Sequence, residues 1–154
     1  MSYRSPKTTK AAHMDEEGNF NEAIILLTAA SSEGDLDALT LLGRRLLMGD
    51  RAPRMPKEGA HMLLEAAQKD HVVAVATMAV LQCLGIQQKK NWQDALASLT
   101  HAACLGWGPA RQQLLILTPE QVEGDAMQLI KSGPASLWQR LGSSDEFPIV
   151  FVTQ

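Results

Sequence analysis

Four histidines and two cysteines are the side chains of this 154-residue sequence best suited to metal binding or nucleophilic chemistry. His61 and His101 could face one another, but no Asp, Glu or Cys completes a zinc site with them. Cys83 and Cys104 form no C-x-x-C motif, and we expect two buried thiols in a reducing cytoplasm. These residues therefore predict no metal site and no cofactor.

Catalytic motifs are also missing. The sequence contains no H-E-x-x-H, no phosphate-binding loop and no dinucleotide glycine motif. Ser143 and Ser144 lie in a Gly-Ser-Ser-Asp-Glu stretch that lacks the context of a nucleophile elbow. The acidic run from Asp15 to Glu17 suggests a solvated face beside a helix end. We predict no catalytic residues and a chain that is not an enzyme.

Charge and hydropathy exclude other classes. A net charge of −3, a pI near 5.8 and 5% aromatic residues disfavour nucleic-acid binding. The longest apolar stretch, 72–81, is too short for a membrane span, and no apolar segment follows the N-terminal charges as in a secretory signal. The sequence predicts a soluble, cytoplasmic protein.

An internal repeat organises the chain. Aligned with itself at an offset of 35 to 37 residues, the sequence places small and large apolar residues in the same columns three times. Such a period is typical of helix-pair repeats, in which each pair completes its core against the next. The columns are Ala23, Ala60 and Ala95; Ala29-Ala30, Ala66-Ala67 and Ala102-Ala103; Gly34, Asp70 and Gly106; Ala38, Ala74 and Ala110; Leu42, Met78 and Leu114.

Each repeat is expected to hold two helices. Residues 34–50 carry a 3.6-residue apolar stripe between Asp35 as N-cap and Gly49 as stop. After two prolines, residues 57–70 give a second helix with Ala60, Leu63, Leu64 and Ala67 buried. The next unit has helices at 72–85 and at 91–106, where Asn91 is the N-cap. A third unit begins at 108 and continues over 118–131.

The ends of the chain depart from this pattern. We expect residues 1–18 to be a flexible leader, 19–141 a solenoid of about three units plus a half unit, and 142–154 a linker and β-prone tail. Residues 19–34 then form an orphan second helix. The tail, FPIVFVTQ, would dock on the solenoid, self-associate or begin a second domain, since an unpaired strand edge is a liability.

The sequence LLGRRLLMGD followed by PKEGAHMLLEAAQKDH resembles the Sel-one-like repeats, relatives of the tetratricopeptide repeats. In the first unit the matching positions are Ala38, Leu42, Gly43, Gly49, Lys57, Ala60, Leu64, Ala66 and Ala67. In the next unit they are Ala74, Met78, Gly85, Trp92, Ala95, Leu99, Ala102 and Ala103. The family's tyrosine column holds Leu46 and Gln82, and Ala79 replaces a glycine. The resemblance implies an all-α fold, a right-handed α-α superhelix.

The resemblance also implies a function. Members of the family typically hold a partner protein or peptide on a concave face lined by the first helices. Here a groove with Arg44 near one end and an apolar middle suits an extended peptide or a helix. The residues implied are Asp37, Thr40, Arg44, Val73, Ala76, Val80 and Gln112, with Leu47, Cys83 and Ile116 in the same columns. The alternative is that about half of these residues belong to the core.

Two other functions stay open. Solenoids of this type can precede a prolyl-hydroxylase-like 2-oxoglutarate/Fe(II) oxygenase, and this chain would then be the arm that presents the substrate. The two-His, one-carboxylate triad of such an enzyme is absent from this sequence. The atypical ends alternatively suggest a self-assembling array. The main expectation is a scaffold that binds a protein or peptide and is a monomer or associates weakly with itself.

Overall fold

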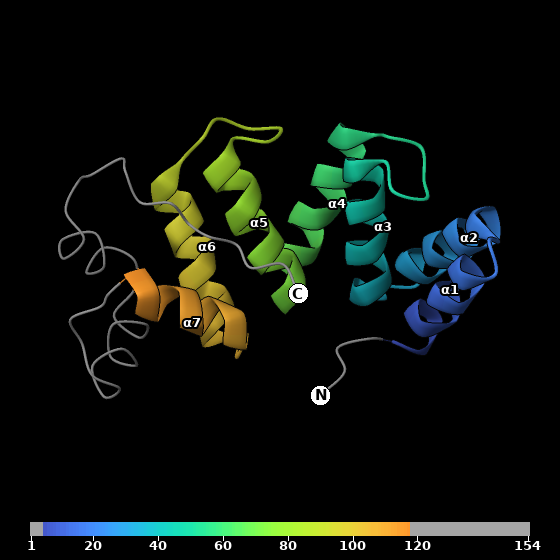
Figure 1. The fold of residues 1–154 in the computed structure, drawn as a ribbon, viewed down its shortest axis with the longest axis horizontal. Coiled ribbons are helices and arrows are strands. Elements are labelled where there is room, and N and C mark those ends of the chain that lie inside the picture. Colours follow the sequence, from blue (N-terminus) through green and yellow to red (C-terminus); the bar gives the residue numbers. More distant parts are fainter. Residues whose placement is uncertain (1–4, 118–154) are drawn as a thin grey trace. The chain divides into compact units, whose positions relative to one another are not determined.

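A computed structural model describes residues 5–117 of the chain, with the side chains of residues 5–114. This part is all α-helical, without a strand, as the sequence predicts (Figure 1). The expected helix at 118–131 and the linker and tail at 142–154 lie outside the described residues. The helices are α1 Pro6–Glu16, α2 Phe20–Ser32, α3 Leu36–Met48, α4 Pro56–Gln68, α5 Val72–Leu84, α6 Trp92–Cys104 and α7 Gly108–Leu117.

The helices repeat every 36 residues. The second helices α2, α4 and α6 begin at positions 20, 56 and 92, and the first helices α3, α5 and α7 begin at positions 36, 72 and 108. Each of the five complete helices in these two series is 13 residues long. This regularity confirms the solenoid of helix-pair repeats.

Three leucines at the same repeat position anchor the second helices. Leu27, Leu63 and Leu99 are the largest fully buried side chains of the described part. Small residues accompany them, because alanine lets neighbouring helices approach while leucine fills the remaining space. Ala30, Ala66 and Ala102 are 0% exposed one turn later, and Ala38, Ala74 and Ala110 are 0% exposed on the first helices.

The expected buried stripe of α4 is confirmed at Leu63 and wrong at Ala60 and Leu64. Gly59, and not Ala60, shares the buried position of Ala23 and Ala95, while Leu64 is 43% exposed. The reason is a backbone contact between α3 and α4: a Cβ atom on Gly59 would lie 2.5 Å from the carbonyl oxygen of Gly43. A prediction based on apolar side chains overlooks a glycine. Here the missing side chain of Gly59 is what lets α3 and α4 pack closely.

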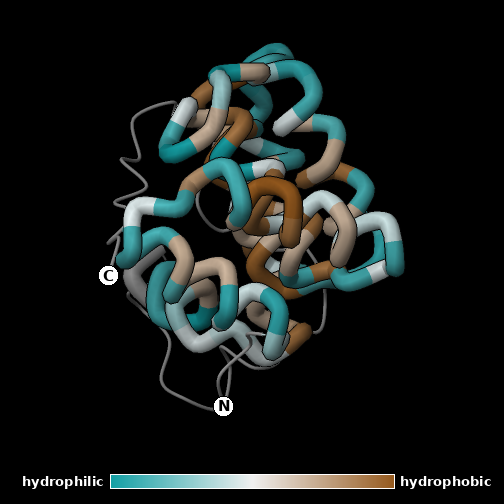
Figure 2. Tube along the Cα trace, turned by 90° about the vertical axis from the view of Figure 1, so that its right-hand side faces the viewer, coloured by the Kyte–Doolittle hydropathy of each residue, from teal (hydrophilic) through white to brown (hydrophobic). Residues whose placement is uncertain are grey.

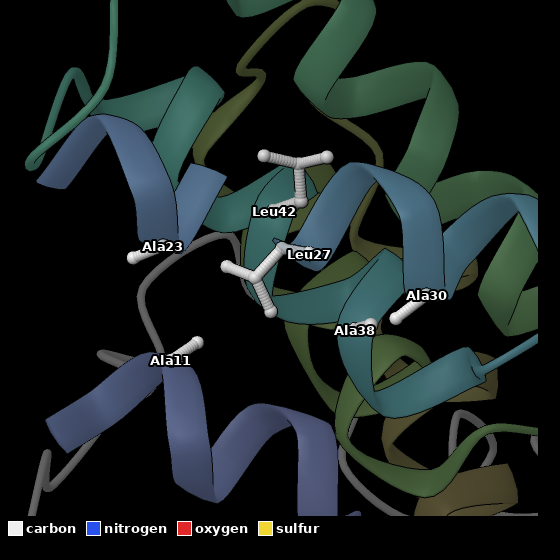
Figure 3. Packing of buried hydrophobic residues seen from close by; sticks show 6 residues of the cluster. All are labelled: Ala11, Ala23, Leu27, Ala30, Ala38 and Leu42. Atoms are coloured by element: carbon white, nitrogen blue, oxygen red, sulfur yellow. The ribbon is translucent and has the colours of Figure 1, made fainter. Parts of the chain in front are cut away.

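The expectation of a flexible leader is wrong for Pro6–Glu16, which form helix α1. The Ser5 side chain caps this helix by accepting a 3.3 Å hydrogen bond from the Thr8 N–H, and Pro6 occupies its first turn. Ala11 is buried against Ala23 and Leu27 of α2 (Figure 3). Helix α2 is therefore no orphan, because α1 is its partner. The other domain boundaries stay predictions.

The capping residues expected from the sequence are confirmed. Asp35 accepts a 3.1 Å hydrogen bond from the Ala38 N–H, and Asn91 accepts one of 3.0 Å from the Gln93 N–H. Gly49 ends α3 with a left-handed φ of 73°, a conformation that glycine adopts without strain. Hydrophobic and hydrophilic stretches follow one another along the chain (Figure 2), while α5, VVAVATMAVLQCL, is apolar almost throughout.

The chain divides into two compact units, residues 1–74 and 75–154. In the first unit α1 packs on α2, α2 on α3 and α3 on α4. One core cluster of this unit consists of Ala11, Ala23, Leu27, Ala30, Ala38 and Leu42 (Figure 3). In the second unit α6 packs on α7, and a 2.7 Å hydrogen bond joins the side chains of Gln82 on α5 and Ser98 on α6.

Candidate partner-binding groove

A groove with a volume of about 760 Å³ lies within the first unit. Its walls are α1 and α3, the residues directly after α3, and the beginning of α5. Helices α1, α3 and α5 are the first helices of their pairs. The groove therefore lies on the helix set that the sequence resemblance assigns to partner binding.

Four of the seven expected binding residues line this groove, namely Asp37, Thr40, Arg44 and Val73. Thr40 is only 3% exposed, so it contributes to the floor of the groove. The remaining three lie in the second unit. There Ala76 is 4% exposed and belongs to the core, Val80 is half-buried and Gln112 is exposed. The repeat position shared by Thr40 and Ala76 faces inward in both units, which the sequence did not reveal.

A buried ion pair closes one side of the groove. The Asp15 side chain on α1 is 1% exposed, and the Arg45 side chain on α3 is 7% exposed. Arg45 donates hydrogen bonds to both carboxylate oxygens of Asp15, one of them 3.2 Å long from Nη1 to Oδ1. Arg51 Nη1 lies 3.6 Å from the same carboxylate. The expectation that Asp15 belongs to a solvated acidic run is wrong, because two arginines distant in sequence neutralise it.

A chain of three polar side chains lies on another side of the groove. His71 Nε2 lies 2.8 Å from Asp37 Oδ1, and His71 Nδ1 lies 2.9 Å from Thr40 Oγ1. The Ala74 N–H at the start of α5 donates a 3.4 Å hydrogen bond to Nδ1. In a neutral ring Nδ1 is therefore the acceptor, and Nε2–H donates to Asp37.

The order hydroxyl, imidazole, carboxylate is that of a nucleophile triad. Here the hydroxyl belongs to a residue that is 3% exposed in the middle of α3. His71 occupies the position that the N-cap Asp35 holds 36 residues earlier, and its ring bonds the backbone of α5. This geometry ties α3 to the start of α5 and leaves little room for a substrate at Thr40.

Arg44 differs from the other charged residues of the groove. Its side chain is exposed, and no ion pair to it exists among residues 5–114. Met48 follows one turn later, is 73% exposed and also lines the groove. An exposed guanidinium beside an exposed thioether can bind a carboxylate and an apolar group together.

The cysteines separate in the structure. Cys83 is 5% exposed, as expected, but Cys104 is exposed, so the expectation of two buried thiols is wrong for Cys104. Cys83 lies on a buried face of α5, whereas Cys104 lies on an exposed face of α6. Their spacing in the sequence did not show this difference. Burial raises the pKa of the Cys83 thiol, and the charge of Lys90 opposes this rise.

Metal-binding clusters and membrane-spanning helices are both missing from the described part of the chain. No group of three His, Cys, Asp or Glu side chains in this part of the chain is placed to hold a metal ion. No helix between residues 5 and 117 combines the length and apolar character needed to cross a membrane.

Comparison with known proteins points to one fold. No family model matches the sequence, and no curated protein matches it. The crystal structure of a Sel1 repeat protein from Oxalobacter formigenes is similar, with a TM-score of 0.65 and 22% sequence identity. The match covers 85% of this chain and 57% of that protein, so the chain spans little more than half of its length. The Sel-one-like resemblance is thus confirmed for the fold: this chain folds as a helical repeat solenoid similar to that Sel1 repeat protein.

Proposed function

We propose that this chain is a scaffold that binds a short segment of a partner protein in the groove between α1 and α3. The observation that carries this proposal is the groove itself. Its volume of about 760 Å³ lies within the usual range of roughly 300–1,000 Å³ for binding sites. It combines the apolar residues Ala12, Leu41 and Met48 with an exposed cation, Arg44.

The fold supports the same function. Stacked helix pairs present their first helices side by side and so produce extended surfaces that solenoids use for binding. Both α1 and α3 are first helices, and both contribute to the groove. A scaffold also needs no catalytic group, in keeping with a groove whose Thr40 hydroxyl is nearly inaccessible.

The test is a selection of binders from a random octapeptide library displayed on phage, with the full chain as the target. Selected peptides are then measured against two variants. Ala12→Trp fills the groove from the half-buried wall of α1, and Ala29→Trp adds the same side chain at an exposed position of α2 outside it. We expect Ala12→Trp to abolish binding and Ala29→Trp to preserve it.

Thermal unfolding of both variants checks that the substitutions leave the fold intact. Peptides that bind wild type and Ala12→Trp equally well would place recognition elsewhere on the chain. That result, or a selection that yields no binder at all, contradicts the proposed function.

A further inference from the structure

We propose that the groove selects a segment in which a carboxylate lies two residues from an apolar side chain. Arg44 binds the carboxylate and Met48 contacts the apolar group. This inference rests on the proposed function, and it defines the chemistry of the partner that the groove accepts.

Among residues 5–114, ion pairs account for every charged side chain of the groove except Arg44. Each of the four carboxylates that line it lies against a basic side chain: Asp15 against Arg45 and Arg51, Glu16 against His13, Asp37 against His71, and Asp50 against Arg51. Within residues 5–114, Arg44 has no such partner. Its planar guanidinium offers a fork of donors that matches a carboxylate in a bidentate arrangement.

The repeat itself does not require a cation at this position. The equivalent residues 36 and 72 positions later are Val80 and Ile116. Arg44 is therefore a feature of this one unit and not of the packing that all units share. A charge that the fold does not use, placed in a groove, is a candidate for partner recognition.

Met48 supplies the apolar half of the site. It is the last residue of α3 and is 73% exposed, although its side chain is large and apolar. Leu84, at the same position of the next first helix, is 59% exposed. Two successive first helices, α3 and α5, thus end in an uncovered apolar side chain, and that of α3 lines the groove.

The helix sets the spacing in the partner. Arg44 and Met48 are i,i+4 neighbours, whose Cβ atoms lie about 5–6 Å apart. In an extended chain, side chains two residues apart lie on one side at roughly 6.6 Å. A segment of a few residues is too short to form a stable helix in water. The matching motif is therefore a carboxylate, any residue and an apolar residue, in either chain direction.

Selections from the octapeptide library against three targets test this motif. With wild type and with the exposed control Lys57→Glu, we expect Asp or Glu at a fixed place two residues from an apolar residue. With Arg44→Glu, we expect Lys or Arg at that place. Arg44→Ala should weaken wild-type-selected peptides about tenfold or more. Arg44→Lys should weaken them less, and Met48→Ala should relax only the apolar preference.

The outcomes separate this inference from the proposed function. If Ala12→Trp blocks the selected peptides but they show no acidic preference, the motif is wrong and the groove remains a binding site. If Arg44→Glu still selects acidic peptides, Arg44 is not their partner and the inference is overturned. If no peptide binds in the groove, both proposals fail. Because Arg44 is exposed, thermal unfolding should show that its variants stay folded.

Discussion

At the scale of single residues, the close packing of α3 on α4 depends on the absence of a Cβ methyl group at Gly59. A Cβ atom on Gly59 would meet both the Gly43 carbonyl oxygen and the Leu47 nitrogen at 2.5 Å. The other second helices carry alanine at this position, Ala23 and Ala95. The contact of α3 with α4 is therefore closer than the repeat pattern alone requires.

We predict that Gly59→Ala lowers the free energy of unfolding by about 1–3 kcal/mol, because the helices must move apart. The matched control is Gly108→Ala in α7, where a Cβ atom would have no neighbour within 4 Å. Urea denaturation measures both. Equal stability of Gly59→Ala and wild type would contradict the backbone contact.

A second prediction concerns the buried ion pair of Asp15 and Arg45. Asp15→Ala leaves the Arg45 guanidinium buried without its carboxylate, so we expect a loss of about 3–5 kcal/mol. The double variant Asp15→Leu, Arg45→Met should recover most of this loss, since no charge stays buried. The exposed pair of Lys7 and Glu33 gives the control: Lys7→Ala should cost at most about 1 kcal/mol. A double variant no more stable than Asp15→Ala would refute the coupling.

Cys83 makes stability depend on pH. Burial raises the pKa of this thiol above its ordinary value of 9.0. Below that value the thiol is protonated in both states, and its contribution to stability is complete. Above that pH the thiol ionises in the unfolded state but stays protonated in the folded state. The free energy of unfolding therefore falls with rising pH until the pKa of the folded state is passed.

We therefore predict that stability falls less steeply in Cys83→Ala than in wild type between about pH 8 and pH 10. Denaturation midpoints measured across this range give both slopes. The comparison cancels the lysines and the tyrosine, which titrate in both proteins. Parallel pH profiles would show that burial of Cys83 does not hold its thiol protonated.

At the scale of elements, apolar periodicity predicts the helices whose buried residues are apolar. It located α3 to α6 within a few residues and found the caps Asp35 and Asn91. It missed α1, because two of the three buried residues of that helix are the polar Thr8 and Asp15. Thr8 bonds Ser5 at the cap of α1 itself, whereas Asp15 is paired with Arg45 of α3, a partner that a single sequence does not show. Gly59 was missed for the related reason that it has no side chain.

Helix α1 leads to a prediction of its own. If residues 1–18 were only a leader, their deletion would leave stability unchanged. Because α1 covers Ala23 and Leu27 and neutralises Arg45, we expect the deletion to lower the Tm clearly. The full-length variant Lys10→Ala, an exposed change on α1, is the control. A deletion variant that melts with wild type would contradict the packing of α1.

At the scale of the whole molecule, the 36-residue period could be derived from the sequence, and the groove only in part. The first-helix columns led to Asp37, Arg44 and Val73, which line one groove. The same columns led to Ala76, whose burial depends on neighbouring helices. Arg45 has an ion pair and Arg44 has none that the structure describes. This difference arises from the three-dimensional packing, so the sequence, in which the two arginines are identical neighbours, does not show it.

Binding of a partner segment in the groove of α1 and α3 can be observed residue by residue. The most direct measurement is amide chemical-shift mapping of the ¹⁵N-labelled full chain, titrated with a peptide selected from the octapeptide library. We expect shifts clustered in α1, in α3 from Asp37 to Met48, and at His71 to Val73. Shifts confined to α2 and α4, or scattered without saturation, would contradict it.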